Sequence, residues 1–133
     1  MTFKAGVYYI GDPCYIMNRD TWSDFCNLVF KNLFDQDEPK FKDQLFFMTN
    51  PKYGDGTYYD NYGKEYFVDS GCIGIFPEEL IEKEAVGGHI VIFDKDFKVD
   101  CKNYVLKCDD IFVFLDNSVH DEQERDFFDD FPF

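Results

Sequence analysis

The clearest pattern of hydrophobic and polar positions in this sequence predicts an amphipathic helix of about three turns. Its apolar residues follow one another at intervals of 3, 1, 3, 1 and 3, so they share one helix face, and polar residues 18–21 offer N-caps before them. We expect this face to pack on the core, and Trp22→Ala to cost about 3–5 kcal/mol. The residues of this stripe are Trp22, Phe25, Cys26, Val29, Phe30 and Leu33.

Most other hydrophobic residues occur in short runs bounded by glycine, proline and aspartate, which is typical of strands joined by tight turns. Between residues 89 and 115 the runs follow closely, which predicts an antiparallel meander in the C-terminal half. Pro77 and the two glutamates after it predict a short second helix that begins at 77–81 and is ended by Gly87 and Gly88. The predicted fold class is α+β: a curved antiparallel β-sheet packed by one main amphipathic helix and a short second helix. The predicted strands are 6–10, 45–48, 66–68, 72–76, 89–93, 97–101, 104–108 and 111–115.

Length and charge narrow the classes of protein that fit. The 133 residues suffice for one core, and we expect a single α+β domain over 1–115 followed by an acidic, aromatic tail over 116–133. The net charge of −14 disfavours nucleic-acid binding through a basic patch. No apolar run fits a membrane span and no signal-peptide pattern follows Met1, so a protein without membrane contact is expected. Five cysteines without a closely spaced pair favour reduced thiols, and no metal or cofactor is predicted.

Three segments carry a resemblance to a known family. They read YIGDPCY at 9–15, YGDGTY at 53–58 and VDSGCIGI at 68–75. These segments resemble those of a small-protein family of phages and other large-DNA viruses, over roughly residues 6–93. The resemblance implies a virus-encoded protein that works in the host cytoplasm, and it supplies no catalytic residues.

The glycine and aspartate turns of these segments form the first candidate site. If they converge, they would line one pocket with the tyrosines of 53–66, whose rings offer stacking surfaces. The pocket would hold a small nucleotide-like ligand, with turn amides at its phosphate, and the protein would sequester a signal of host defence. The alternative is that the aspartates cap turns and the tyrosines pair across strands. The candidate ligand-binding residues are Asp12, Tyr53, Asp55, Tyr58, Tyr59, Tyr62, Asp69 and Ser70.

Two other chemistries are open to the same segments. Asp55, Asp60 and Asp69 would bind a hard cation if their oxygens met, although their spacing matches no calcium loop. Cys72 or Ser70 with His89 would form a nucleophile–base pair of a small hydrolase. No catalytic motif surrounds either pair, so a protein without catalytic activity remains the main expectation.

The tail offers a candidate partner-binding segment. Its last residues read DDFPF and resemble the acidic tip of bacterial single-stranded-DNA-binding proteins, in which acids precede an aliphatic–Pro–Phe end. The resemblance implies docking on a partner protein, not DNA binding. The alternative is that the rings fold back on the body of the protein. The residues concerned are Asp129, Asp130, Phe131 and Phe133.

The acidic surface and the aromatic content leave two further functions open. Closely spaced carboxylates imitate a DNA backbone, so the chain would inhibit a DNA-binding host protein through 78–84 and the tail. A structural component of a virion would instead bury aromatic patches between copies, as a homo-oligomer. The leading expectation is a non-catalytic binding protein that sequesters a small ligand or blocks a host protein. The acids of the imitation surface are Glu78, Glu79, Glu82 and Glu84.

Overall fold

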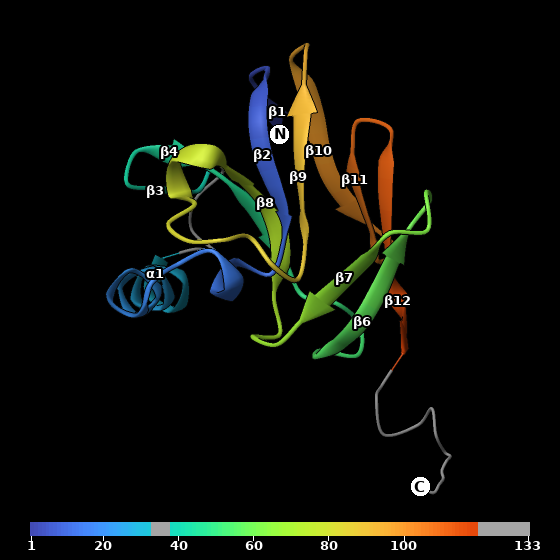
Figure 1. The fold of residues 1–133 in the computed structure, drawn as a ribbon, viewed down its shortest axis with the longest axis horizontal. Coiled ribbons are helices and arrows are strands. Elements are labelled where there is room, and N and C mark those ends of the chain that lie inside the picture. Colours follow the sequence, from blue (N-terminus) through green and yellow to red (C-terminus); the bar gives the residue numbers. More distant parts are fainter. Residues whose placement is uncertain (33–37, 120–133) are drawn as a thin grey trace, which may run out of the picture.

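The protein forms two antiparallel sheets and one α-helix in a computed structural model that describes residues 1–32 and 38–119 (Figure 1). The six-stranded sheet has the order β1 (Thr2–Phe3), β10 (Phe97–Lys102), β11 (Val105–Cys108), β12 (Ile111–Val119), β6 (Gly56–Asp60), β7 (Glu65–Val68). The four-stranded sheet has the order β5 (Phe47–Thr49), β8 (Ile73–Pro77), β2 (Gly6–Gly11), β9 (His89–Phe93). The remaining elements are a hairpin of β3 (Lys40–Phe41) and β4 (Gln44–Leu45), the helix α1 (Arg19–Asn32), and the 3-10 turns η1 (Pro13–Tyr15) and η3 (Glu78–Leu80).

The predicted α+β class with a curved antiparallel sheet is confirmed, and several details differ. The strand β6 is absent from the prediction, and the predicted strand 45–48 is divided between β4 and β5. The second helix is a single 3-10 turn over Glu78–Leu80, so it ends well before Gly87 and Gly88, the predicted end. The C-terminal meander consists of β10, β11 and β12, whereas β9 pairs with β2 in the other sheet. Three aspartate and lysine residues join β9 to β10, and the chain crosses from one sheet to the other there.

Two cores lie on the two faces of the four-stranded sheet. In β2 the side chains of Tyr8 and Ile10 enter the first core, between the sheets, while Tyr9 enters the second core, under α1. A strand buried on both faces is apolar at every position, as residues 7–10 are. The buried members of the first core are Phe3, Tyr8, Ile10, Tyr58, Tyr66, Val68, Ile73, Ile75, Phe93, Phe97, Val99, Leu106, Cys108, Ile111, Val113 and Leu115, and those of the second are Tyr9, Ile16, Met17, Phe25, Phe41, Phe46, Phe76 and Leu80.

The helix α1 closes the second core with Trp22, Phe25 and Val29 of the predicted apolar face. Phe25 is fully buried, and its ring lies 5.2 Å from those of Phe41 and Phe46. Trp22 stacks on Phe25 at 5.8 Å but is only half-buried, so it covers the edge of this core instead of filling its centre. Of the predicted stripe, Leu33 lies outside the described residues.

Gly74 in β8 allows the sheet to form next to β5. A Cβ atom at this position would lie 2.0 Å from the carbonyl oxygen of Phe47, on the neighbouring strand. The backbones therefore approach more closely than any larger residue permits.

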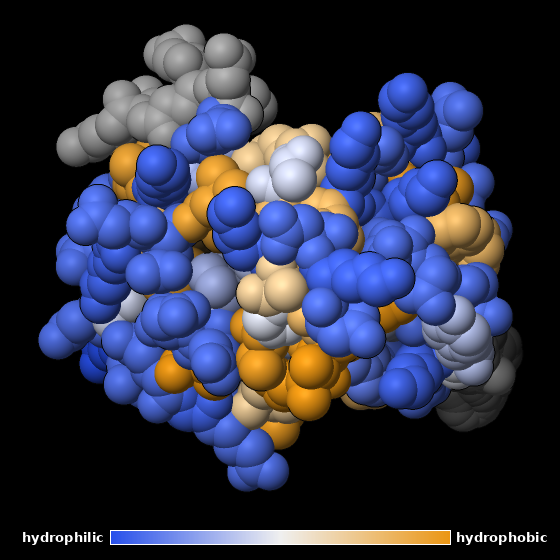
Figure 2. Space-filling model, turned by 90° about the horizontal axis from the view of Figure 1, so that it is seen from above, coloured by the Kyte–Doolittle hydropathy of each residue, from blue (hydrophilic) through white to orange (hydrophobic). Residues whose placement is uncertain are grey.

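The surface is largely hydrophilic, with a hydrophobic area on the side where β9 lies in front of β10 (Figures 1 and 2). Within the described part of the chain, no helix is long and apolar enough to cross a membrane.

Candidate functional site

Two of the three segments that carry the resemblance, 9–15 and 68–75, meet at one buried carboxylate. Asp12 follows β2, caps η1 and is fully buried. Its Oδ1 accepts hydrogen bonds from the Cys14 amide at 2.9 Å and the Ser70 hydroxyl at 2.7 Å. Its Oδ2 accepts from the amides of Asp69 and Ser70, both at 2.7 Å. We call this arrangement of Asp12, Cys14, Asp69 and Ser70 the Asp12 junction.

The Asp12 junction joins two loops that are far apart in sequence. A carboxylate offers about four lone-pair sites, and four donors occupy them here. The Ser70 hydroxyl is also committed, because it donates to Asp12. In this arrangement the two residues have a structural use, which agrees with the turn-capping alternative for Asp12.

Two tyrosines extend the Asp12 junction. The hydroxyl of Tyr15 donates to Oδ2 of Asp69 at 2.6 Å, and that of Tyr9 donates to the carbonyl of Asp12 at 2.9 Å. Burial and the contact with Asp69 raise the pKa of Tyr15. Burial, followed by the charge of Asp12, raises the pKa of Tyr9. Both phenols therefore remain protonated donors throughout the neutral range.

The tyrosines of the candidate site lie in different surroundings. Tyr58 is fully buried in the first core and donates to the carbonyl of Gly54 at 2.8 Å. Tyr59, next to it on β6, points to the other face, and its hydroxyl lies 3.3 Å from Glu65. Tyr53 and Tyr62 are both exposed, but the first precedes β6 and the second follows it. The structure therefore does not bring these four rings into one hollow.

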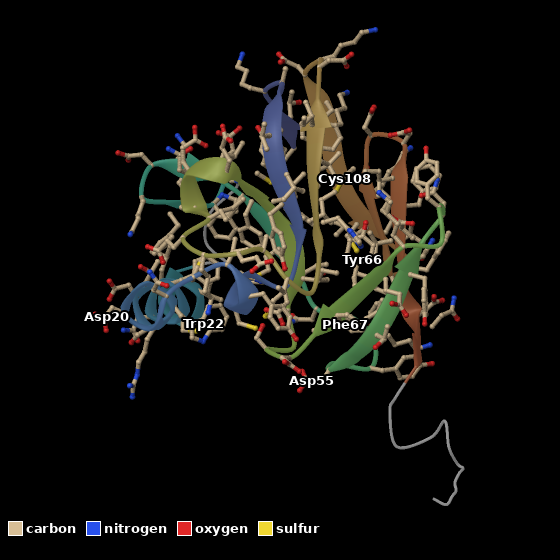
Figure 3. All side chains as sticks on the ribbon, viewed as in Figure 1. Asp20, Trp22, Asp55, Tyr66, Phe67 and Cys108 are labelled. Carbon is tan, nitrogen blue, oxygen red and sulfur yellow. The ribbon has the colours of Figure 1, made fainter. Side chains whose placement is uncertain are left out.

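Asp55 is exposed near Gly71, where the turn before β6 meets the turn after β7. Figure 3 shows Asp55 at the opposite end of the β6–β7 pair from Tyr66. A small apolar hollow of about 60 Å³ lies close to the Asp12 junction, lined by Ser70, Cys72 and residues of α1. It is too small for a nucleotide, since ligand pockets span roughly 300–1,000 Å³.

The geometry does not support the cation site or the nucleophile–base pair considered from the sequence. Among the described residues, no group of three or more His, Cys, Asp or Glu side chains is arranged to hold a metal ion. His89 pairs with Ile10 across the sheet, so its ring faces the first core, 4.8 Å from Tyr66, and its Nε2 contacts the carbonyl of Glu65 at 2.7 Å. Cys72 borders the α1 side, on the opposite face of the same sheet. The two residues therefore do not form a nucleophile–base pair here.

The glutamates proposed as a DNA-like surface lie on and after η3. All four of Glu78, Glu79, Glu82 and Glu84 are exposed. Glu82 is also structural: it accepts from the Asn18 amide and the Thr21 hydroxyl, both at 2.7 Å, at the start of α1. The tail residues Asp129, Asp130, Phe131 and Phe133 lie outside the described residues.

An open groove beside β9 includes Tyr62, one of the predicted ligand-binding residues. Two adjoining hollows of about 550 and 470 Å³ share Val91, Ile92 and Asp110. One wall is the edge of β9, and the other is formed by the β6–β7 turn and the β11–β12 turn. We call this feature the β9 groove. Its lining residues are Asp60, Tyr62, Lys64, Tyr66, His89, Ile90, Val91, Ile92, Phe93, Asp94, Lys95, Asp96, Asp109, Asp110 and Ile111.

The far wall of the β9 groove is held firmly in place. Buried Asp60 accepts from the amides of Tyr62 and Lys64, at 2.8 and 3.0 Å, and from the Tyr66 hydroxyl at 2.7 Å. Tyr62 then reaches across to the β11–β12 turn, where its hydroxyl donates to Asp110 at 2.6 Å. The wall is thus pre-organised, which reduces the entropy that binding would cost.

The near wall is an unusual strand edge. β9 is an edge strand of the four-stranded sheet. It pairs with β2 on one side, and none of the described strands pairs with its other side. Ile90 and Ile92 are 49% and 76% exposed on the face that α1 covers elsewhere. In an antiparallel ladder alternate residues direct their N–H and C=O groups to either side, so part of the β9 backbone is directed away from β2. A bare edge with exposed isoleucines is a template for strand pairing.

Sequence reasoning missed most of the β9 groove. It contains Tyr62 of the candidate ligand-binding residues, and Asp60 and His89, which were considered for other chemistry. Ile90, Ile92 and Asp110 came only with the structure. The available signal was a strand that is apolar on both faces. Such a strand is expected in the middle of a covered sheet, and here it lies at an edge.

Comparison of the chain with protein-family models, curated proteins and solved structures gave no match.

Proposed function

We propose that this protein is a non-catalytic binding protein that blocks a partner protein by holding one of its extended segments along the β9 groove. Strand addition supplies affinity through backbone hydrogen bonds and selectivity through alternate side chains. The resemblance to proteins of phages and large-DNA viruses makes a host protein the partner in this proposal. Of the two versions expected from sequence, blocking a partner now has the better support.

The observation that carries the proposal is the open edge of β9 next to a pre-formed hollow. The strand is five residues long, and at about 3.3 Å per residue it would pair with a segment of roughly the same length. The exposed isoleucines offer apolar contact on one face, and the groove accepts side chains on the other. The groove is less suited to binding a small nucleotide, because aspartates outnumber lysines in its lining and repel phosphate.

The state of the thiols supports a non-catalytic role. Burial, followed by the charge of Asp12, raises the pKa of Cys14 and of Cys72. Burial raises the pKa of Cys108 to about 12. A thiol nucleophile acts as the thiolate, which needs a lowered pKa.

Selection from a displayed library of random dodecapeptides tests the proposal. We expect enriched peptides to bind the wild-type chain and Val86→Lys alike, and to lose at least about tenfold in affinity on Ile92→Lys. Val86 is the matched control, since it is an exposed aliphatic residue outside the β9 groove. Bound peptide should also slow amide hydrogen exchange in β9.

Failure to obtain any binder that depends on Ile92 would overturn the proposal. A panel of nucleotides, including cyclic dinucleotides, tests the competing version by thermal shift. A stabilisation that Tyr62→Ala abolishes would favour nucleotide sequestration in the same groove and count against the partner-blocking function.

A further inference from the structure

We infer that the segment bound along β9 is cationic on the side that faces the groove and apolar on the side that meets Ile90 and Ile92. This inference rests on the proposed function and specifies the chemistry of the partner. It follows from the two faces of β9 and from the distribution of charge along the groove.

Strand geometry separates the two faces of a bound segment. Side chains of an added strand alternate, so every second one lies beside Ile90 and Ile92, and the others point toward the groove. The isoleucine face lacks the cover that α1 gives to Tyr9 and Phe76 on the same side of the sheet. Apolar, β-branched side chains on the partner would supply that cover.

The other side chains would meet an acidic wall. Four exposed aspartates flank the β9 groove, two in the β9–β10 turn and two in the β11–β12 turn. The basic residues that line the described groove are Lys64 and Lys95. The aspartates are Asp94, Asp96, Asp109 and Asp110.

These charges are concentrated at one end of the groove. The hollow beside Phe93 contains all four aspartates, of which Asp96 also forms an ion pair with Lys4 at 3.8 Å. The hollow beside His89 contains Lys64 and two aspartates that already have partners: Asp110, bonded to Tyr62, and buried Asp60, bonded to Tyr66. A lysine or arginine near the Phe93 end would therefore gain most from the wall.

A second copy of the chain fits this wall poorly. Pairing β9 with β9 of another copy would bring two acidic grooves into one interface, in a protein of net charge −14. Like charges across an interface oppose association. The same isoleucines with a cationic partner carry no such penalty.

Three fluorescein-labelled hexapeptides test the inference, each alternating isoleucine with lysine, glutamine or glutamate. We expect the lysine peptide to bind about tenfold more tightly than the glutamine peptide, and the glutamate peptide to bind more weakly than both. Raising the salt concentration should narrow these differences, because the aspartates are exposed. Fluorescence anisotropy with the full chain measures each affinity.

A matched pair of double variants locates the effect. Asp94→Asn with Asp109→Asn removes two charges from the groove, and Asn tolerates the left-handed backbone of Asp109, at a φ of 57°. Asp24→Asn with Asp43→Asn removes two exposed charges outside the groove, and Asp43 has a φ of 64°. We expect the groove pair to weaken the lysine peptide about fivefold and leave the glutamine peptide unchanged, and the control pair to alter neither by more than about twofold.

The outcomes separate the two proposals. Equal binding of lysine and glutamine peptides, with dependence on Ile92, would overturn the inference and leave the proposed function standing. No binding of the hexapeptides together with no Ile92-dependent peptide from the library would overturn both. Sedimentation that shows a dimer which Ile92→Lys dissociates would identify a second copy as the occupant and overturn the inference.

Discussion

The four-stranded sheet has two halves that differ in what covers them. Over β8 and β2 the helix α1 buries Tyr9 and Phe76 completely, while over β9 the isoleucines of the same face remain exposed. The polar groups differ in the same way. Asp12, on the covered half, has four donors within 2.9 Å, whereas aspartates beside β9 lie at the surface.

The difference shows that a dense polar motif is not by itself a binding site. Two of the glycine and aspartate segments that stand out in the sequence, 9–15 and 68–75, close the fold around Asp12, and the donors that contact it are used there. The β9 edge stands out less in sequence, yet it leaves backbone and apolar surface available to a partner. Substitutions on the two halves should therefore differ sharply in their effect on the free energy of unfolding.

The largest effect is expected at Asp12. Replacing Asp12 with Ala leaves three amides and one hydroxyl without their acceptor in a buried site, so we expect a loss of about 3–5 kcal/mol in urea unfolding. Ser70→Ala removes one of these donors and should cost about 1 kcal/mol.

On the open half, Ile92→Ser should change stability by less than about 0.5 kcal/mol, because this side chain is 76% exposed. Equal effects of Asp12→Ala and Ile92→Ser would remove the contrast between the halves.

The second prediction compares the loss of stability on replacing two aromatic residues of α1. Phe25→Ala removes a fully buried ring and should cost about 3–5 kcal/mol. Trp22→Ala should cost about 1–3 kcal/mol, below the value expected from sequence, since Trp22 is half-buried at the edge of the second core. Thermal and urea unfolding of both variants check the order. A larger loss of unfolding free energy for Trp22→Ala than for Phe25→Ala would contradict the placement of Trp22 at the edge of this core.

The parts of the fold that depend on local periodicity could be predicted from the sequence. The spacing from Trp22 onward defines α1, and turn residues mark the ends of most predicted strands, but β6 is absent from the prediction. Periodicity does not say which strands become neighbours, so β9 was expected to continue into the meander and pairs instead with β2. Asp12 illustrates a second limit, because the amide of Ser70 that it binds is 58 residues away.

The candidate site was harder to predict because its parts come from three distant segments. The β6–β7 turn, β9 and the β11–β12 turn form one groove only after the sheets pack. Within 53–66, the alternation of side chains along β6 and the turn after it decides which tyrosines are buried and which face the groove. Tyr58 and Asp60 point inward on β6, while Tyr62 lies in the turn at the groove. Composition alone does not distinguish these positions.

The smallest effect concerns the helix that closes the covered half. The amide of Asn18, followed by the hydroxyl of Thr21, lowers the pKa of Glu82 below its usual 4.5. A carboxyl whose pKa is lower in the folded chain stabilises the fold fully above the unfolded value, and this contribution is lost as the pH falls through the lowered value. Glu82→Gln should therefore reduce stability by about 0.5–1 kcal/mol at pH 7, and the difference from wild type should shrink below roughly pH 4.

Glu84→Gln is the control for this measurement, since it removes one exposed charge from the same loop. Urea unfolding of the three chains between pH 3 and pH 7 separates the helix cap from the general effect of acid on a chain with 27 carboxylate side chains. If Glu84→Gln reproduces both the loss at pH 7 and its disappearance in acid, the effect belongs to net charge. In that case Glu82 does not fasten α1 over the covered half, and its two 2.7 Å contacts contribute little to the contrast with the β9 edge.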